Sequence, residues 1–596
     1  MFLPTTPDEM NALGWDALDV ILVTGDTYID SPFIGVAVIG RLLASKGYRV
    51  GIIAQPEMES DADIACLGEP LLFWGVSGGS VDSMVANYTA TKKKRRTDDF
   101  TPGGENNRRP DRAVMAYTNL IRRYFKNTVP IVLGGVEASL RRVAHYDYWS
   151  NNIRRSILFD AKADYLVYGM GEKAILDLAG QLKRGDSVED VKGICYIAKE
   201  PKADYIQLPD YEACVSQKKT FTEMFHVFYQ NNDPITAKGL IQQTGDRYLI
   251  QNPPQPNPTQ KELDSYYELP YERDPYISEE DGEVRAMDTI RFSITSHRGC
   301  YGECNFCSIA VHQGRTVISR SPASVLREAK ELTQHPLFKG AILDVGGPTA
   351  NMYGFECEKK VKSGACSNKR CLFPEACPSL KPDHRNYMRL LRRVSGVPGV
   401  KKVFVASGIR PDLAMDDEVG LDFISQVARK HTSGQLKLAP EHTSPRILKL
   451  MGKPGVQSLE KFRNRFTQTG NNLDREQYLT YYFIAAHPGC SGKDMAELKA
   501  YATRELSISP EQVQIFTPLP STYSALMYYT QSDPFTGEPL FVEKDIKRKE
   551  KQKAILVVKR REMSEKGFAN VGKPASKKSV KIKKEFKRPV PEWKKR

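Results

Sequence analysis

Short apolar runs that predict strands alternate with helical periodicity through the N-terminal half of the chain. The first apolar run, residues 19–24, is followed by an amphipathic helical pattern at 36–45 and by a second run at 49–54. Three later runs, at 71–76, 131–133 and 165–168, each lead into glycine. Strands that end in glycine turns before helices are typical of a doubly wound parallel sheet. The pattern predicts an α/β, Rossmann-like domain over residues 1–250.

A second series of apolar runs follows a segment without sustained periodicity. Residues 251–286 are rich in Pro, Asn, Tyr, Asp and Glu and predict a linker. Six apolar runs then alternate with helical patterns such as 323–332 and 387–394. The six are residues 290–295, 341–345, 403–406, 436–439, 481–486 and 513–516. They predict a (β/α)6 partial barrel over residues 287–543, with chemistry at the carboxyl ends of its strands.

The net charge of +14 is concentrated at one end of the chain. Residues 544–596 contain 21 Lys+Arg against 6 Asp+Glu, a net +15, which leaves 65 against 66 in the preceding 543 residues. Such a block is typical of a solvated, partly disordered tail, and less often of a contact with RNA or the ribosome. A second basic run, residues 92–96, is followed at once by Asp98 and Asp99 and adds little to that case.

Composition describes a globular chain, with 40% hydrophobic residues and a mean hydropathy of −0.45. No apolar run approaches the roughly 18 residues that a membrane helix needs, and the N-terminus lacks the features of a signal peptide. We therefore expect a cytoplasmic protein without a membrane contact. In that compartment the eleven cysteines are expected to be metal ligands or buried thiols rather than disulfides.

Three cysteines form a CxxxCxxC loop directly after the first strand of the second series: Cys300, Cys304 and Cys307. Three thiolates on one short loop can bind three irons of a [4Fe–4S] cluster and leave the fourth iron open for chemistry. A zinc site is the alternative, with His297 or His312 as a nearby further ligand. The spacing favours the cluster.

This loop, with Phe306 before its last cysteine, resembles the signature of the radical S-adenosylmethionine (SAM) superfamily. The resemblance assigns SAM contacts to Gly346 and Gly347 after the second strand, although Pro348 stands where the family has an acidic residue. It further implies SAM contacts from Ser407, Arg410 and Glu441. It implies reductive cleavage of SAM to methionine and a 5′-deoxyadenosyl radical, with an electron donor such as flavodoxin or ferredoxin.

The N-terminal half resembles the cobalamin-binding-like domain that precedes many radical SAM cores. The similar segments begin at Ser31, Ile131 and Asp164. No histidine precedes His145, so the DxHxxG ligand motif of such domains is absent, and we do not expect cobalamin. With matching features along the whole chain, the protein resembles the YgiQ-like family of radical SAM proteins, a resemblance that brings no substrate with it.

A second cysteine group lies in a polar insertion at residues 351–380: Cys357, Cys366, Cys371 and Cys377. Four thiols this close together are predicted to hold a structural zinc ion or an auxiliary iron–sulfur cluster, and the spacing does not decide between these and no metal. Three functions remain open: a radical SAM enzyme acting on an unknown substrate such as RNA or a ribosomal component, an iron–sulfur RNA-binding or regulatory protein without turnover, and a cobalamin-dependent methylase.

Overall fold

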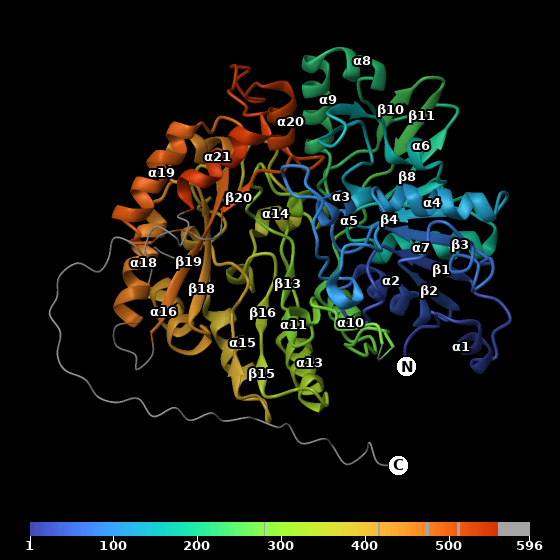
Figure 1. Ribbon diagram of the computed structural model, residues 1–596, viewed down its shortest axis with the longest axis horizontal. Helices are drawn as coiled ribbons and strands as arrows, with labels where there is room; N and C mark the ends of the chain where they lie inside the picture. The colour runs from blue at the N-terminus through green and yellow to red at the C-terminus, as the bar shows by residue number, and fades with distance from the viewer. Residues whose placement is uncertain (279, 415–417, 471–475, 509, 511–512, 558–596) are drawn as a thin grey trace, which may run out of the picture. The chain divides into compact units, whose positions relative to one another are not determined.

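The computed structural model describes residues 1–278, 280–414, 418–470, 476–508, 510 and 513–557. Its N-terminal half is built on a nine-stranded sheet with the order β2-β1-β3-β4-β7-β8-β11-β10-β9 (Figure 1). The strands are β1 (Val20–Thr24), β2 (Val50–Ala54), β3 (Phe73–Ser77), β4 (Ile131–Gly134), β7 (Tyr165–Val167), β8 (Ile194–Ala198), β9 (Ile206–Gln207), β10 (Leu240–Thr244) and β11 (Arg247–Gln251).

The first five strands are parallel and follow the flavodoxin-like order 2-1-3-4-5. Alternate residues of β1 pack into two different apolar cores. Val20 and Leu22 face the core formed with α2 (Gly35–Ala44) and α7 (Glu172–Arg184). Ile21 and Val23 face the core formed with α4 (Ala113–Tyr124) and α6 (Ile157–Ala161). Helices on both faces explain the continuous apolar runs, and the predicted doubly wound domain is confirmed.

The extension of this sheet, β8 to β11, was not predicted; its pairs are antiparallel except for β9, which runs parallel to β10. Its strands carry buried polar side chains that interrupt the apolar period. Gln242 accepts a hydrogen bond from the backbone of Ala144 at 2.8 Å, and Gln251 accepts one from the Arg142 guanidinium at 3.1 Å. These donors satisfy side-chain oxygens that would otherwise be costly to bury, so the strands form despite the weak sequence pattern.

The segment predicted as a linker contains helix α10 (Gln260–Tyr267). The Thr259 hydroxyl and the Glu262 carboxylate form a capping box at its start, and the helix buries Leu263, Tyr266 and Tyr267. Further along, helix α11 (Met287–Ile290) occupies the beginning of the first predicted core strand, and β12 (Ser293–Thr295) starts three residues later than predicted.

The second half contains the six predicted strands, all parallel. Neighbours follow chain order, from the pair β12 and β16 through β15 and β17 to the sheet β18-β19-β20, and an Ile409–Leu438 bridge adjoins β18. β15 and β16 are two parts of one interrupted strand. Besides β12, the strands are β15 (Ala341–Ile342) with β16 (Asp344–Gly346), β17 (Lys402–Val403), β18 (Gln435–Glu441), β19 (Tyr478–Ala485) and β20 (Val513–Ile515). The predicted class of the core is confirmed.

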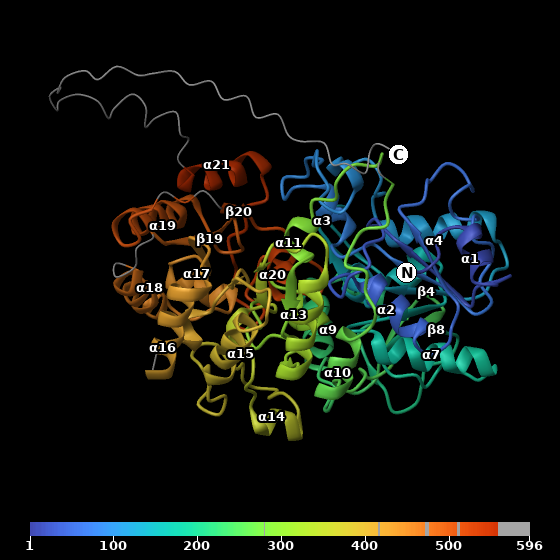
Figure 2. The ribbon, with the colours of Figure 1, turned by 90° about the horizontal axis from the view of Figure 1, so that it is seen from below.

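Helices alternate with these strands along the chain, and Figure 2 shows several of them from below. They are α13 (Pro322–Gln334), α15 (Arg385–Ser395), α16 (Glu418–Gln426), α17 (Pro445–Met451), α18 (Gln457–Gly470), α19 (Gly492–Arg504) and α20 (Tyr523–Thr530). The predicted tail, residues 544–596, begins with another helix, α21 (Ile546–Leu556), and its residues 558–596 lie outside the described part of the chain. None of the helices in the described residues has the length and apolar character that a membrane crossing requires.

Candidate functional site

The CxxxCxxC loop is closed at its base by two short strands. β13 (His297–Arg298) precedes it and pairs antiparallel with β14 (Ile318–Ser319), which follows it. Gly299 begins the loop with φ +87, and a Cβ there would lie 2.1 Å from the Thr316 carbonyl oxygen. Only glycine fits this backbone. The pairing of β13 with β14 fixes the direction in which the chain enters the loop at Cys300.

Asn305, in the middle of the loop, ties it to the core. Its backbone N–H donates to Met451 at 2.9 Å and its side-chain amide donates to Leu450 at 2.9 Å, both at the end of α17. The Arg370 guanidinium donates to the Asn305 side-chain oxygen at 2.7 Å. These contacts hold the segment between Cys304 and Cys307 rigidly, a role that the sequence pattern did not indicate.

The thiols of Cys300 and Cys304 in this loop accept hydrogen bonds. The Gly302 N–H donates to Cys300 Sγ at 3.3 Å, and the Arg410 guanidinium donates to Cys304 Sγ at 3.6 Å. Burial raises the pKa of Cys300 and raises that of Cys307 to about 12, so the free thiols would be protonated at neutral pH. Hydrogen bonds to sulfur help to set the reduction potential of an iron–sulfur cluster. The residues of this loop fit such a cluster.

Binding of a single metal ion has less support. Within the described residues, no three His, Cys, Asp or Glu side chains converge as a single-ion site requires. A [4Fe–4S] cluster does not need such convergence, because each thiolate binds a different iron. His297, one of the two histidines of the zinc alternative, uses both ring nitrogens in hydrogen bonds, to Thr349 O at 3.0 Å and to Ser296 Oγ at 2.9 Å.

The predicted SAM glycines lie at the end of β16, beside the cysteine loop. A Cβ on Gly347 would lie 2.7 Å from His297 Nε2, and one on Gly346 would lie 2.5 Å from Ser407 Oγ. Both positions therefore need glycine because His297 and Ser407 approach the backbone closely there. The Ser407 hydroxyl donates to Asp344, and the Thr349 hydroxyl is hydrogen-bonded to Cys300. Two glycines and a serine assigned by resemblance thus adjoin the cluster loop.

Arg410 is oriented toward the cysteine loop. Its guanidinium binds the Asp412 carboxylate through two nitrogens, at 3.0 and 2.7 Å, in addition to its contact with Cys304. Burial opposes the charge, but Asp412 and Cys304 raise the pKa of Arg410 well above its usual range. Arg410 thus carries a fixed positive charge beside the cluster loop, and its predicted SAM contact remains a prediction.

Glu441 and Phe306 complete the set of predicted residues. Glu441 has φ +67, and burial raises the pKa of its carboxyl group, with Lys453 Nζ 3.7 Å away. Phe306 packs against the apolar cores of both halves and meets the His487 ring edge-on, with 6.4 Å between centroids. Lys453 and Asp412 were not predicted, although they stand 12 residues after Glu441 and two residues after Arg410.

The second cysteine group is spread over the insertion. Cys357 and Cys371 pack with Cys300 against a small apolar cluster that includes Tyr301. The Lys360 ammonium lies 3.8 Å from Cys371 Sγ, and the Cys377 N–H donates to the Cys371 carbonyl at 2.8 Å. Cys366 follows Ala365, whose N–H donates to Asp233 in the N-terminal half. The structure brings two of these thiols beside the first loop, and the metal remains a prediction.

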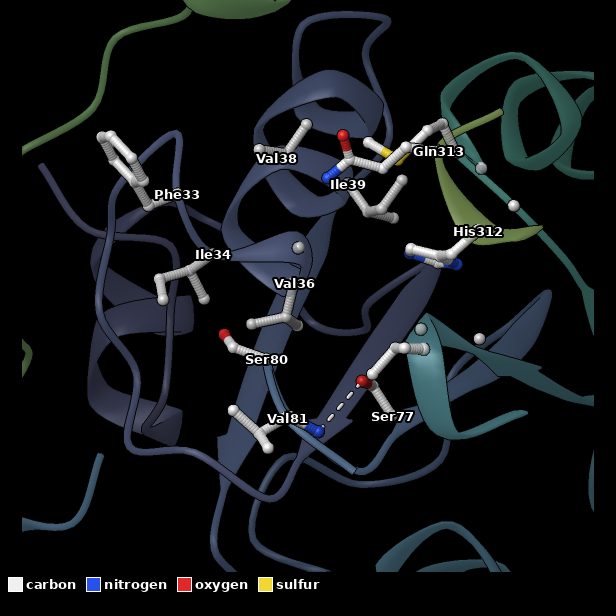
Figure 3. Close-up of a pocket in the computed structure, with 18 of the residues that line it drawn as sticks. Phe33, Ile34, Val36, Val38, Ile39, Ser77, Ser80, Val81, His312 and Gln313 are labelled. Atoms are coloured by element: carbon white, nitrogen blue, oxygen red, sulfur yellow. Dashed lines mark hydrogen bonds between the residues drawn. The ribbon is translucent and has the colours of Figure 1, made fainter. Parts of the chain in front are cut away.

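A cavity of about 630 Å³ opens between the carboxyl ends of the two sets of parallel strands (Figure 3). Its core side includes Gly346, Gly347, Ser407 and residues after the cysteine loop. Its N-terminal side is mainly apolar, with glycines at strand ends; Gly134 has open space within 4 Å of the position of a Cβ. Figure 3 labels ten of the lining residues: Phe33, Ile34, Val36, Val38, Ile39, Ser77, Ser80, Val81, His312 and Gln313.

Acidic groups at the cavity wall are paired with arginines, whereas Asp344 accepts hydrogen bonds from Ser407 and from the Ala406 N–H. Asp26 lies 2.8 Å from the Arg109 guanidinium, and Glu172 is paired with Arg298. Burial lowers the pKa of His312 to about 4, so its imidazole is neutral at pH 7, and the buried Nδ1 atom has no hydrogen-bond partner within the described residues. The cavity combines an apolar wall with neutral polar groups near the cluster loop.

The fold and the cysteine loop together define a protein of the radical SAM class, and comparison with protein families agrees. The family model described as "Radical SAM N-terminal" matches residues 2–293. Radical SAM proteins use a [4Fe–4S] cluster and SAM, so the class implies both cofactors.

Relatives identify the family more narrowly. A UPF0313 protein of Fusobacterium nucleatum is 56% identical over 564 residues, 94% of this chain and 99% of that protein. UPF0313 proteins of Methanocella arvoryzae and Thermotoga maritima are 48% and 47% identical, over 93% and 94% of this chain and 92% and 99% of theirs. The chain belongs to the UPF0313 family, which is the YgiQ-like family that the sequence resembles.

Two solved structures are similar at low identity. The radical SAM methyltransferase TsrM from Kitasatospora setae, with cobalamin and a [4Fe–4S] cluster bound, is 15% identical, with a TM-score of 0.48 over 86% of this chain and 78% of its own. The cobalamin-dependent SAM radical enzyme OxsB, with aqua-cobalamin bound, is 13% identical, with a TM-score of 0.48 over 88% of this chain and 57% of its own.

Proposed function

We propose that this protein is a radical SAM enzyme that binds a [4Fe–4S] cluster through Cys300, Cys304 and Cys307 and cleaves SAM reductively. When bound, the cluster would supply the electron for reductive cleavage of SAM to methionine and a 5′-deoxyadenosyl radical, which would act on a substrate in the cavity by hydrogen abstraction. A one-electron donor such as flavodoxin or ferredoxin would reduce the enzyme.

The residues of the chain position the reactants and exclude water. The Gly346–Gly347 backbone has no side chains to keep a ligand away and lies next to Thr349, which contacts Cys300. Arg410 offers a fixed positive charge beside Cys304, and Asp412 holds it in place. The apolar N-terminal wall keeps bulk water from a reactive radical.

One observation carries the proposal. Residues that lie more than 100 positions apart in the chain meet at one strand-end face: Arg410 lies 3.6 Å from Cys304, and the cavity begins at Gly346 and Gly347. Catalytic groups of open and closed α/β sheets gather at this edge. A protein that used the cluster only for structure would not need a large cavity there.

The test is anaerobic reconstitution with iron and sulfide, followed by metal analysis and a 5′-deoxyadenosine assay with SAM and dithionite. Cys300→Ala should lose the open cluster and all deoxyadenosine formation. Cys66→Ala, which changes a half-buried thiol of the N-terminal half, is the matched control and should retain both. If the protein binds about four irons but forms no deoxyadenosine, whether or not substrate pools from cells are added, the result would favour the regulatory iron–sulfur protein instead. About eight irons would assign an auxiliary cluster to the second cysteine group.

A cobalamin-dependent radical SAM methylase is the second candidate, and the size of the cavity favours it. The cavity extends well beyond the predicted SAM residues to open glycine positions at Gly35 and Gly134. His145 is not among the residues that line this cavity, so it cannot serve there as the missing ligand of the DxHxxG type. Incubation with hydroxocobalamin and gel filtration should leave a corrinoid absorbance on the protein if this candidate is right.

A further inference from the structure

The fold joins the two basic runs of the sequence into one surface. Residues 92–96 follow helix α3 (Ser83–Asn87), and the second run forms α21. Lys93 Nζ lies 2.6 Å from the Glu550 carboxylate of α21. Figures 1 and 2 both place α21 near the segment that follows α3. We call the exposed cations of residues 92–96 and of α21 the basic surface.

A buried tyrosine connects the two runs. The Tyr148 ring has Lys92 Nζ 4.8 Å from its centroid and Lys549 Nζ 5.1 Å from it. The Lys549 ammonium also donates to the hydroxyls of Tyr148 at 3.3 Å and Tyr528 at 2.8 Å. Burial, and after it the charge of Lys92, lower the pKa of Lys549 to about 8. The two runs are therefore close enough for their charges to repel each other.

Most of the cations on this surface point to solvent without a carboxylate partner. All five residues of 92–96 are exposed, as are Lys547 and Lys551 of α21. In the described part of the chain, no carboxylate lies within ion-pair distance of Lys94, Arg96, Lys547 or Lys551. Residues 558–596, which follow α21 in the chain, contain 15 Lys+Arg against 4 Asp+Glu. Such an accumulation favours a polyanionic partner over an ordinary solvated surface.

Aromatic rings lie beside these cations. Tyr88 and Trp149 are half-exposed, with 5.6 Å between ring centroids, and Lys92 Nζ donates to the Trp149 carbonyl at 3.1 Å. Cations that contact phosphates and half-exposed rings that can stack on unpaired bases are the two features of surfaces that bind single-stranded nucleic acid. A membrane surface would need the cations but not the paired rings.

The basic surface also adjoins the cavity. The Arg95 guanidinium donates to the carbonyl oxygens of Val85 at 3.1 Å and Tyr88 at 3.2 Å. Val85, with Val81 and Asp82 just before it, lines the cavity. A nucleic-acid strand bound over residues 92–96 would therefore lie beside the cavity rather than on a remote face.

We infer that the basic surface binds single-stranded nucleic acid through its sugar–phosphate backbone and unpaired bases. Cations of both runs contact phosphates, and Tyr88 and Trp149 stack on bases. This inference goes beyond the proposed function and does not depend on cleavage of SAM, because neither the cluster loop nor the SAM residues take part in the contact.

The test is fluorescence anisotropy of the full chain with a labelled oligouridine of about 20 nucleotides, a matched single-stranded DNA and a duplex. Lys94→Glu/Lys547→Glu removes one cation from each run. It should weaken binding to oligouridine by about tenfold or more at about 0.1 M salt. The salt dependence should also become shallower, by roughly 0.7 for each phosphate that the variant no longer neutralises. Trp149→Ala should weaken binding with little change in the salt slope.

The control is Lys330→Glu/Lys339→Glu, which makes the same change in charge at two exposed lysines in and just after α13. It should bind oligouridine as the unchanged chain does. Equal binding by the two double variants would overturn the inference, as would tighter binding to the duplex or to anionic vesicles. Comparison of the affinities for oligouridine and for the matched single-stranded DNA identifies which of the two is preferred. Cys300→Ala should retain binding, so failure of the proposed catalysis and failure of this inference are distinguishable.

Discussion

Arg410 provides a quantitative test of the cluster site. Its guanidinium is buried, bound by Asp412, and 3.6 Å from Cys304 Sγ. Arg410→Gln keeps an amide donor at about the same place but removes the positive charge. Because reduction adds one negative charge to a cluster held by these cysteines, the variant should be harder to reduce.

The size of the effect follows from the distance. Two unit charges 3.6 Å apart interact by about 4.6 kcal/mol at an effective dielectric constant of about 20. The added electron is spread over the whole cluster, which lies farther away on average than the nearest sulfur, so we expect roughly half of this, about 2 kcal/mol. For a one-electron couple that corresponds to a potential lower by about 90 mV.

The measurement is a redox titration of the reconstituted protein, followed by electron paramagnetic resonance of the reduced cluster under anaerobic conditions. Arg410→Lys is the matched control, because it keeps the charge and should shift the potential much less than Arg410→Gln. Iron content must be equal in all three proteins. An unchanged potential in Arg410→Gln with a full complement of iron would refute the assignment of Arg410 as a charge beside the cluster.

Two further predictions concern the loop and the buried histidines. Gly299→Ala should lose reconstituted iron and lower the melting temperature, whereas Gly314→Ala, at φ +94 but with open space around a Cβ, should lose less; equal losses would contradict the steric argument. Burial lowers the pKa of His145 and His297 to about 4 and of His487 to about 3. Since the unfolded chain binds these protons near pH 6.5, the free energy of unfolding should fall as pH decreases from about 6.5 to 4, by about 1.4 kcal/mol per pH unit for each histidine. Urea denaturation across that range measures the free energy of unfolding. His145→Gln should reduce the slope by about 1.4 kcal/mol per pH unit, and a flat profile in the unchanged chain would contradict the prediction.

The sequence alone was sufficient for the fold class and for the family. Apolar runs that end in glycine predict parallel strands because both faces of such a sheet are covered and its carboxyl edge turns sharply. The cysteine loop was recognisable because its three ligands are close together in the chain. The strands β8 to β11 were missed where buried amides such as Gln242 and Gln251 interrupt the apolar period, since their stability depends on distant partners.

Only the tertiary structure decided which separated residues meet. The contact between Arg410 and Cys304, the anchoring of Asn305 at the end of α17, and the joining of residues 92–96 to α21 all depend on how strands and helices are ordered in space. Local periodicity reports burial along one element, but the separation of two side chains depends on the packing of every element between them. The three predicted cluster ligands are therefore recognisable from neighbouring positions in the sequence. The cavity and the basic surface, in contrast, form only when the two halves of the chain pack together.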